Sequence, residues 1–181
     1  MSLLLLDLDG TIRQSLSGEQ YFQHSQDQQA IAGVEDALRS YSDEWIMVGI
    51  TNQGGVAAGH KSIQQCIAEQ QYTLELFPRL KEIYFCPDFG GKKCFRVTRH
   101  NVYNHSRSQW SGQYRKPGAG MLNLAMARHK QTPEKTYYVG DRPEDEIAAR
   151  RARVQFQWAG EWREQQGASH KNAFIPKTLI N

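Results

Sequence analysis

After Met1 the chain reads Ser2-Leu3-Leu4-Leu5-Leu6-Asp7-Leu8-Asp9-Gly10-Thr11, and its architecture can be worked out from this stretch. Four consecutive leucines fit both faces of a buried parallel strand, and the run is too short to cross a membrane. Asp7 and Asp9 are two residues apart, so in extended backbone their carboxylates point the same way, beyond the carboxyl end of the strand. Ligands of open α/β sheets bind at that end. The alternative is a solvated Asp-x-Asp-Gly turn without chemistry.

Length and composition limit the class of protein. A chain of 181 residues, 39% of them hydrophobic, predicts one globular domain spanning residues 1–181. There is no apolar run of about 18 residues and no signal-peptide pattern after Met1, so we expect a cytoplasmic protein without a membrane partner. Three cysteines, an odd number, argue against a disulfide framework. Nothing in the sequence specifies an oligomeric state.

Apolar runs alternate with segments of helical periodicity along the chain. They predict buried strands at 2–6, 45–50, 81–86, 136–139 and 154–158, and helices at 27–41, 56–76, 116–129 and 143–152. The polar segment 13–29 is expected to be a long loop, and the tail after Ala159 has too weak a pattern for a prediction. The alternation predicts an α/β fold with a Rossmann-like, doubly wound, mainly parallel sheet.

A basic segment, residues 87–115, interrupts this alternation and is predicted to be a loop insertion. Between Phe89 and Pro133 the chain has no Asp or Glu at all, but it has nine Lys and Arg residues and several aromatic ones. Such a segment favours an anionic partner. Either a multiply phosphorylated small molecule or a nucleic acid fits it, and the alternative is a solvated basic loop.

Polar turns follow three of the first four predicted strands. The second strand ends at Thr51-Asn52-Gln53-Gly54-Gly55, and the fourth ends at Gly140-Asp141-Arg142-Pro143-Glu144-Asp145. Lys116 begins the intervening helix and supplies a cation. Like charges as close as Asp7 and Asp9 require a cation or a shared proton. Anion donors beside several carboxylates therefore predict a site that handles phosphate with Mg²⁺.

The order and spacing of these segments resemble the four motifs of the haloacid dehalogenase (HAD) superfamily. The motifs are Asp7-Leu8-Asp9-Gly10-Thr11, then Thr51, then Lys116-Pro117, and finally Gly140-Asp141-Arg142-Pro143-Glu144-Asp145, across residues 1 to about 157. The segments 50–59 and 115–121 are similar to the subfamily of histidinol phosphatases, heptose bisphosphate phosphatases and polynucleotide 3′-phosphatases. That resemblance implies a HAD-like fold without a large cap domain.

The resemblance also implies roles for individual residues. Asp7 would be the nucleophile that forms an aspartyl-phosphate, and Asp9 would be the general acid and then the general base. Thr51 and Lys116 would bind the phosphoryl oxygens. Substrate contacts are further expected from Asn52, Arg115 and Arg142, although Arg142 alternatively is a solvated turn residue. Mg²⁺ would be held by Asp7, the backbone carbonyl of Asp9, and Asp141, with Asp145 acting through water or orienting its neighbours.

The predicted function is that of a Mg²⁺-dependent phosphomonoesterase acting on a small phosphorylated metabolite, such as a sugar phosphate or histidinol phosphate. A 3′-phosphatase of nucleic-acid ends is the first alternative, and a non-catalytic phosphate- or nucleic-acid-binding module is the second. Relatives often bind zinc in the loop with a Cys-x-His…Cys-x-Cys pattern. Here Cys86 and Cys94 match, but Asp88 and Arg96 occupy the other positions, so structural Zn²⁺ and two packed thiols are alternatives.

Overall fold

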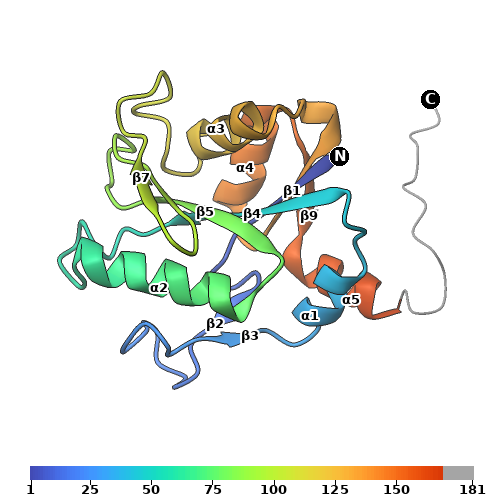
Figure 1. Ribbon diagram of the computed structural model, residues 1–181, viewed down its shortest axis with the longest axis horizontal. Helices are drawn as coiled ribbons and strands as arrows, with labels where there is room; N and C mark the ends of the chain where they lie inside the picture. Colours follow the sequence, from blue (N-terminus) through green and yellow to red (C-terminus); the bar gives the residue numbers. More distant parts are fainter. Residues whose placement is uncertain (169–181) are drawn as a thin grey trace.

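One seven-stranded sheet organises the computed structural model, which describes residues 1–168 (Figure 1). Its strand order is β7-β6-β5-β4-β1-β8-β9. The strands from β5 across to β9 are parallel, whereas β6 and β7 add an antiparallel edge. The chain starts at the centre, builds one side and then crosses to the other. The predicted doubly wound, mainly parallel α/β sheet is thus confirmed, and the part of the chain described contains no large cap domain.

The elements have the following bounds. The strands of the large sheet are β1 (Ser2–Leu6), β4 (Trp45–Asn52), β5 (Leu80–Cys86), β6 (Phe95–Val97), β7 (Val102–Asn104), β8 (Thr136–Gly140) and β9 (Gln155–Trp158), and a separate pair is β2 (Arg13–Gln14) and β3 (Gln29–Ala30). The helices are α1 (Val34–Arg39), α2 (Ile63–Leu76), α3 (Gly120–His129), the short 3₁₀ helix η1 (Pro133–Lys135), α4 (Pro143–Ala152) and α5 (Ala159–Ala168). Within residues 1–168, no helix is both long enough and apolar enough to cross a bilayer.

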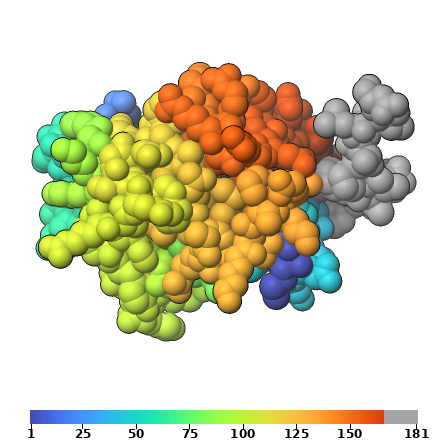
Figure 2. All heavy atoms as spheres, turned by 90° about the horizontal axis from the view of Figure 1, so that it is seen from above, coloured from blue at the N-terminus to red at the C-terminus, as the bar shows by residue number. Residues whose placement is uncertain are grey.

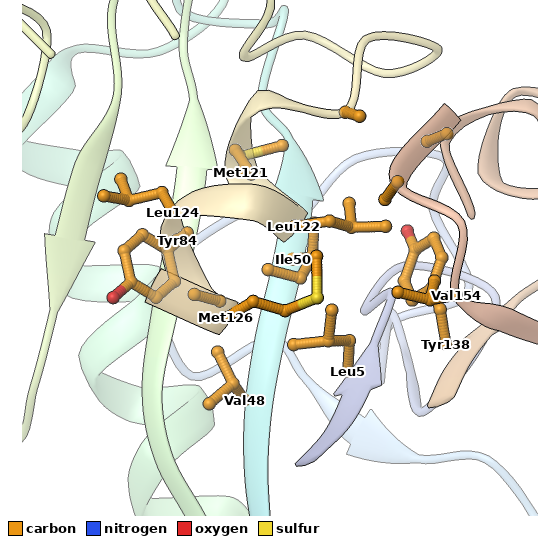
Figure 3. Packing of buried hydrophobic residues seen from close by; sticks show 14 of the residues in the cluster. Leu5, Val48, Ile50, Tyr84, Met121, Leu122, Leu124, Met126, Tyr138 and Val154 are labelled. Atoms are coloured by element: carbon orange, nitrogen blue, oxygen red, sulfur yellow. The ribbon is translucent and has the colours of Figure 1, made fainter. Parts of the chain in front are cut away.

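The leucines of β1 pack into two hydrophobic cores, one on each face of the sheet. Leu3 and Leu5 belong to the core that α3 and α4 cover, and Leu4 and Leu6 belong to the core under α1, α2 and α5. Figure 3 shows Leu5 beside Val48 and Ile50 of β4, with Leu122 of α3 above them. All four leucines are fully buried. The strand is therefore fixed centrally, and the turn that follows it is held at the carboxyl edge of the sheet.

Three helices are shorter than the sequence predicts, and one of them, predicted over 116–129, begins only at Gly120 as α3. The predicted helix 27–41 forms only as α1, because Gln29 and Ala30 pair with β2 and Gly33 turns the chain with a φ of 85°. The predicted helix 56–76 begins only at Ile63. Ser62 caps it in a capping box, accepting a hydrogen bond from the Gln65 backbone at 3.1 Å. The segment before α2 instead forms turns, and Gly54, Gly55, His60 and Lys61 from it line the cavity described below.

The basic segment 87–115 is not a plain loop, because it folds back as the hairpin β6–β7 and extends the sheet. In Figure 2 this yellow-green segment lies at the surface beside the orange residues of α3 and the turn after it. Two of its arginines serve the fold. Arg96 is 4% exposed and paired with Glu82, and Arg99 donates to the carbonyls of Leu74, Pro78 and Leu80. The segment thus offers an outside partner less charge than its composition suggests.

Glu82 on β5 is the centre of a buried charged cluster. Its carboxylate accepts hydrogen bonds from Arg96 at 2.8 Å and from the Tyr84 hydroxyl at 2.8 Å, and His129 lies 2.9 Å away. Burial acts to raise the pKa of Glu82, but the hydrogen bonds of His129, Tyr84 and Arg96 outweigh it and bring the pKa from 4.5 to about 2. The cluster ties the antiparallel edge to α3.

We expect Glu82→Gln to remove part of the acid sensitivity of folding. A pKa that is lower in the folded than in the unfolded chain contributes stability that is present above about pH 4.5 and lost as the pH falls towards 2. The shift corresponds to about 3 kcal/mol near neutral pH. Denaturant unfolding at a series of pH values should show a less stable variant at pH 7 with a flatter acid limb. The exposed Glu75→Gln is the control, and an unchanged acid limb in Glu82→Gln would contradict the assignment.

Candidate active site

A cavity of about 320 Å³ opens at the carboxyl ends of β1 and β4. Parallel strands present the turns that follow them at one edge, so residues far apart in the sequence meet there. Every residue predicted for the site from its motifs, apart from Asp141 and Asp145, lines this cavity. The lining includes Asp7, Asp9, Thr51, Asn52, Arg115, Lys116 and Arg142, together with Gln20, Tyr21, Phe22, Gln53, Gly54, Gly55, His60, Lys61, Glu69 and Glu144.

Lys116 reaches into the floor of the site, where it joins the turn after β1 to β8 and α4. Its Nζ lies 2.5 Å from Asp7 Oδ1 and 2.6 Å from Asp145 Oδ1, and it donates to the Tyr138 hydroxyl at 3.0 Å. The side chains of Lys116, Asp7 and Asp145 are 4%, 7% and 1% exposed. A buried cation bonded on several sides is fixed in place, as a group that must stabilise charge during a reaction has to be.

Burial dominates the protonation of the Asp7 carboxyl. It raises the pKa of Asp7 to about 7, and Lys116 opposes this rise while the neighbouring Asp145 adds to it. For Lys116, burial lowers the pKa, but Asp7 and Asp145 outweigh that and the pKa lies above its usual value. The site therefore keeps its ammonium charged and has an excess of carboxylate that a bound cation would neutralise.

Asp7, Asp141 and Asp145 form a group suited to a hard cation. One ligand atom from each lies within 4.8 Å of the others. Thr11 Oγ1 donates to Asp7 Oδ2 at 3.1 Å and lies 3.5 Å from Asp141 Oδ1. Carboxylate oxygens in such a group fit Mg²⁺. The group is packed against the turn, since a Cβ on Gly10, whose φ is +88°, would clash with the Asp141 carboxylate.

Asp145 is bonded to more protein groups than Asp7 or Asp141 is. Its Oδ1 accepts a hydrogen bond from the Tyr138 hydroxyl at 2.7 Å, and its Oδ2 accepts one from the Arg142 backbone N–H at 3.1 Å. The second bond is also part of the capping of α4. These contacts agree with an orienting role, whereas Asp141 is partly exposed at the edge of the site.

Asp9 lies in a different environment from Asp7. Arg13 donates to both of its oxygens, at 2.9 and 3.1 Å, and Gln53 and Thr51 donate to Oδ2 at 2.9 and 3.3 Å. Burial acts to raise the pKa of Asp9, but the charge and hydrogen bonds of Arg13, with the charge of Lys61, outweigh it and the pKa is lowered. The Asp7 carboxyl thus holds a proton more tightly than the Asp9 carboxyl does, although the two lie only two residues apart.

Asn52, Arg115 and Arg142, the three predicted substrate contacts, differ in how far their side chains are bonded to other protein groups. The Asn52 side chain donates to the Lys116 carbonyl and accepts from the Lys116 backbone N–H, both at 3.0 Å, so its amide holds the Lys116 turn. The Arg115 guanidinium stacks on Phe89 with 5.2 Å to the ring centroid. The Arg142 side chain is 64% exposed and lies 4.0 Å from Glu144. Arg115 and Arg142 both line the cavity, and Arg115 Nη1 is buried without a hydrogen-bond partner among residues 1–168.

Cys86, the last residue of β5, and Cys94 of the basic segment are packed thiols in this structure. Cys86 and Cys94 are both fully buried, and the Cys86 Sγ lies 3.4 Å from the Asp88 carbonyl oxygen. Burial raises the pKa of Cys86 to about 12 and also raises that of Cys94. Among residues 1–168, no group of three or more potential metal ligands includes either cysteine. The Zn²⁺ predicted as an alternative at Cys86 and Cys94 thus gains no support.

Several further residues of the site were not predicted, and among those named here only Gln53 lies in a segment that carries the family resemblance. Arg13 and Gln53 bind Asp9, Lys61 donates to Gln53 Oε1 at 2.8 Å and pairs with Glu69, and Tyr138 joins Lys116 to Asp145. Gln53 follows Asn52 directly, and Arg13 comes four residues after Asp9 in a segment expected to be a loop. The signal that could have identified Arg13 is its position as a charged residue shortly after the turn that contains Asp7 and Asp9. Nothing local marks Lys61 or Tyr138.

Comparison with known proteins agrees with this geometry. The chain matches the polynucleotide kinase 3 phosphatase family over residues 2–159. It is 33% identical over 160 residues to the D-glycero-beta-D-manno-heptose-1,7-bisphosphate 7-phosphatase of Haemophilus ducreyi, covering 83% of this chain and 78% of that protein. It is 30% identical over 155 residues to the D-glycero-D-manno-heptose-1,7-bisphosphate 7-phosphatase of Thermosynechococcus vestitus, covering 82% and 74% of the two chains.

Solved structures show the same fold at lower identity. The D,D-heptose 1.7-bisphosphate phosphatase of B. bronchiseptica, complexed with magnesium and phosphate, superposes with a TM-score of 0.66 at 21% identity, over 93% of this chain and 88% of that one. The D,D-heptose 1,7-bisphosphate phosphatase of Burkholderia thailandensis gives a TM-score of 0.56 at 15% identity, over 95% and 100%. With the match across residues 2–159, these relatives show that the chain belongs to the HAD superfamily of phosphatases, within the heptose bisphosphate phosphatase type.

Proposed function

We propose that this phosphatase is a Mg²⁺-dependent phosphomonoesterase that transfers the phosphoryl group of a small sugar phosphate to Asp7. The observation that carries the proposal is the juxtaposition of Asp7 with Lys116 at 2.5 Å and with Asp141 and Asp145 within 4.8 Å. A carboxylate nucleophile needs a cation to approach an anionic phosphate, and this site supplies both a fixed ammonium and a cation-binding group.

The reaction would proceed in two displacements. An oxygen of Asp7 attacks phosphorus and the bond to the leaving oxygen breaks, while Asp9 gives that oxygen its proton. Water then attacks the aspartyl-phosphate, passing a proton to Asp9, and phosphate leaves as Asp7 is regenerated. Lys116 and Thr51 stabilise the phosphoryl oxygens, and Asn52 positions Lys116 through its two backbone hydrogen bonds.

Asp7 and Asp141, with the backbone carbonyl of Asp9, would hold Mg²⁺, and Asp145 would orient the group. When bound, the cation neutralises charge on the phosphate and on Asp7. The donor set is entirely oxygen, as Mg²⁺ requires. The magnesium in the B. bronchiseptica structure agrees with this cation.

The size and charge of the cavity favour a compact substrate. A volume of about 320 Å³ lies at the lower end of the range for small-molecule sites. Beyond the phosphate, Arg115 and Arg142 lie at the mouth, where they would contact the rest of the molecule. The curated relatives are named as heptose bisphosphate phosphatases, so a phosphorylated sugar is the first substrate class to test.

The family match supplies the second candidate, the 3′-phosphate of a nucleic-acid end. A polymer would need basic residues along its backbone, beyond the cavity. Arg96 is buried in an ion pair, and the exposed Arg99 is bonded to three backbone carbonyls. The other basic residues of 87–115 are Arg115, which lines the cavity, and the exposed Lys92, Lys93 and Arg107. The structure therefore offers few contacts for a polymer, and we rank this candidate second.

A phosphate-release assay with a panel of sugar phosphates and 3′-phosphorylated oligonucleotides tests this ranking. We expect the fastest release from a sugar phosphate, with weak dependence on salt, because charges inside a site are screened less than those on a surface. Arg115→Gln should raise KM for that substrate, while Arg107→Gln, the matched control, should not. A polymer substrate would instead give a log–log salt slope near −0.7 per phosphate contact and a loss with both variants.

A further inference from the structure

A guanidinium group lies directly behind Asp9 on the side away from solvent. The Arg13 side chain is fully buried, whereas the Asp9 side chain is 42% exposed. Arg13 Nε donates to Asp9 Oδ1 at 2.9 Å and Nη2 donates to Oδ2 at 3.1 Å. Two parallel bonds from one planar group fix the plane of a carboxylate as well as its place, which a single bond does not do.

The guanidinium is itself held by neutral groups. Arg13 Nη1 donates to Gln28 Oε1 at 3.1 Å and to the Thr73 hydroxyl, and the guanidinium carbon lies 5.1 Å from the centroid of the Phe22 ring. Gln28 is anchored in turn by donating to the Glu69 carbonyl at 3.0 Å. Among the described residues, Asp9 is the only carboxylate to which Arg13 donates hydrogen bonds, since the partners of Nη1 are neutral. The arrangement orients Asp9 from behind, without occupying the cavity.

The two oxygens of Asp9 are not equally engaged. Oδ2 accepts from Arg13, from Gln53 at 2.9 Å and from Thr51 at 3.3 Å, whereas Oδ1 accepts only from Arg13 among the described residues. A carboxylate oxygen has about two lone-pair positions, so Oδ2 is saturated while Oδ1 retains capacity for one more partner. Oδ1 is therefore the Asp9 oxygen that has a free acceptor position for a substrate or a water.

We propose that Arg13 is a positioning residue that presents Asp9 Oδ1 to the leaving group, and this inference rests on the proposed function. In the first displacement the proton on Oδ1 passes to the leaving oxygen as its bond to phosphorus breaks. In the second, the attacking water gives a proton to Oδ1 as its oxygen bonds to phosphorus and Asp7 is released. Arg13 takes no part in either bond change.

Leaving groups of different basicity separate this role from a purely structural one. A sugar alkoxide needs the proton in order to leave, but a nitrophenolate does not, so misplacing the acid should affect only the first. Arg13→Lys keeps the charge and loses the two-point fork. We expect kcat/KM for a sugar phosphate to fall about 10²-fold, and that for nitrophenyl phosphate to stay within about threefold.

The second displacement gives an independent readout. It needs Asp9 as a base whatever the leaving group was, so the Arg13→Lys variant should accumulate the aspartyl-phosphate from nitrophenyl phosphate. Stopped-flow measurement should then show a burst of about one nitrophenolate per active site, followed by slow turnover. Acid quenching during turnover should recover the phosphorylated protein.

Matched variants keep the test decisive. Arg39→Lys alters an exposed arginine that also pairs with a carboxylate four residues away, Glu35. This variant should leave kcat/KM unchanged for both substrates. If Arg13→Lys does not fold, as judged by thermal unfolding, Thr73→Val removes one acceptor of Nη1 without touching Asp9 and should give the same selective loss at smaller size. Equal losses on both substrates without a burst, or unchanged selectivity in the variant that folds, would overturn the inference.

The failure of this inference can be distinguished from the failure of the proposed function. If the unaltered protein releases no phosphate from either substrate, the proposed function falls and the inference falls with it. If the unaltered protein is active but the variants lose activity uniformly, only the role of Arg13 is overturned. A large selective loss together with a burst supports both.

Discussion

Replacing Asp7 with asparagine should lower phosphate release by about 10⁴-fold or more, because the aspartyl-phosphate can then no longer form. Asparagine has nearly the shape of aspartate, and Lys116 keeps its second carboxylate partner, Asp145 at 2.6 Å, so the site should stay folded. Initial rates on a sugar phosphate and on nitrophenyl phosphate measure the loss. Because the nucleophile acts on every substrate, both rates should collapse together.

The matched control is Asp43→Asn, which alters a fully exposed carboxylate far from the cavity lining. Acid quenching of the unaltered protein during turnover should recover a phosphorylated species whose modified peptide contains Asp7, and the Asp7→Asn protein should yield none. If Asp7→Asn retains the parent rate, the nucleophile is another group and the assignment of this turn is wrong. If it loses activity but still becomes phosphorylated, the mechanism is wrong at its first step.

Removing divalent cations should abolish turnover, and added Mg²⁺ should restore it. The reason is electrostatic: Asp7, Asp141 and Asp145 bring three carboxylates together, Lys116 pairs with only two of them, and a phosphate would add further negative charge. Without a cation, the anionic nucleophile and the anionic substrate repel each other in a buried site. Chelation followed by titration with Mg²⁺ measures the effect. Thermal unfolding should show Mg²⁺ stabilising the protein without any substrate.

Asp141→Asn tests the same group at one residue. Of the three acids, Asp141 has the weakest hydrogen bonding to other protein groups. Its loss should therefore weaken cation binding more than it destabilises the fold. We expect the Mg²⁺ concentration for half-maximal activity to rise about 10²-fold. Glu146→Gln, an exposed acid on the same helix as Asp145, is the control. Full activity of the chelated protein would contradict a metal-dependent mechanism altogether.

Local sequence was enough to predict the sheet and the places where its strands end. Four leucines before Asp7 leave no exposed face, so they predict a strand buried on both sides, and the two cores confirm it. The motif turns could likewise be predicted, because Asp7 directly follows β1, Thr51 is one residue from the end of β4 and Asp141 directly follows β8. The fold class, the absence of a large cap in residues 1–168 and the phosphatase family are all confirmed.

Boundaries were less predictable where two signals competed. Helical periodicity extended through Gln29 and Ala30, but pairing with β2 holds them as a strand. In the segment before α2, periodicity suggested a helix from Val56, while Gly54, Gly55 and Gly59 and the capping box of Ser62 decide otherwise. In both cases a contact or a cap outweighs a weak intrinsic preference.

The tertiary structure alone decided which charges face the substrate. From composition alone, Arg96 and Arg99 belong to the basic residues expected to bind an anion. In the structure, the charge of Arg96 is neutralised by Glu82, fourteen positions earlier in the chain. The contacts of Arg13 with Gln28 and Thr73, and of Lys116 with Asp7, likewise join residues 15 to 109 positions apart. Periodicity and turn chemistry act over a few residues, so they encode the elements. Pairing across the sheet depends on the order and register of its strands, so the sequence supplied the site's reactive groups and the assembled fold fixed their partners.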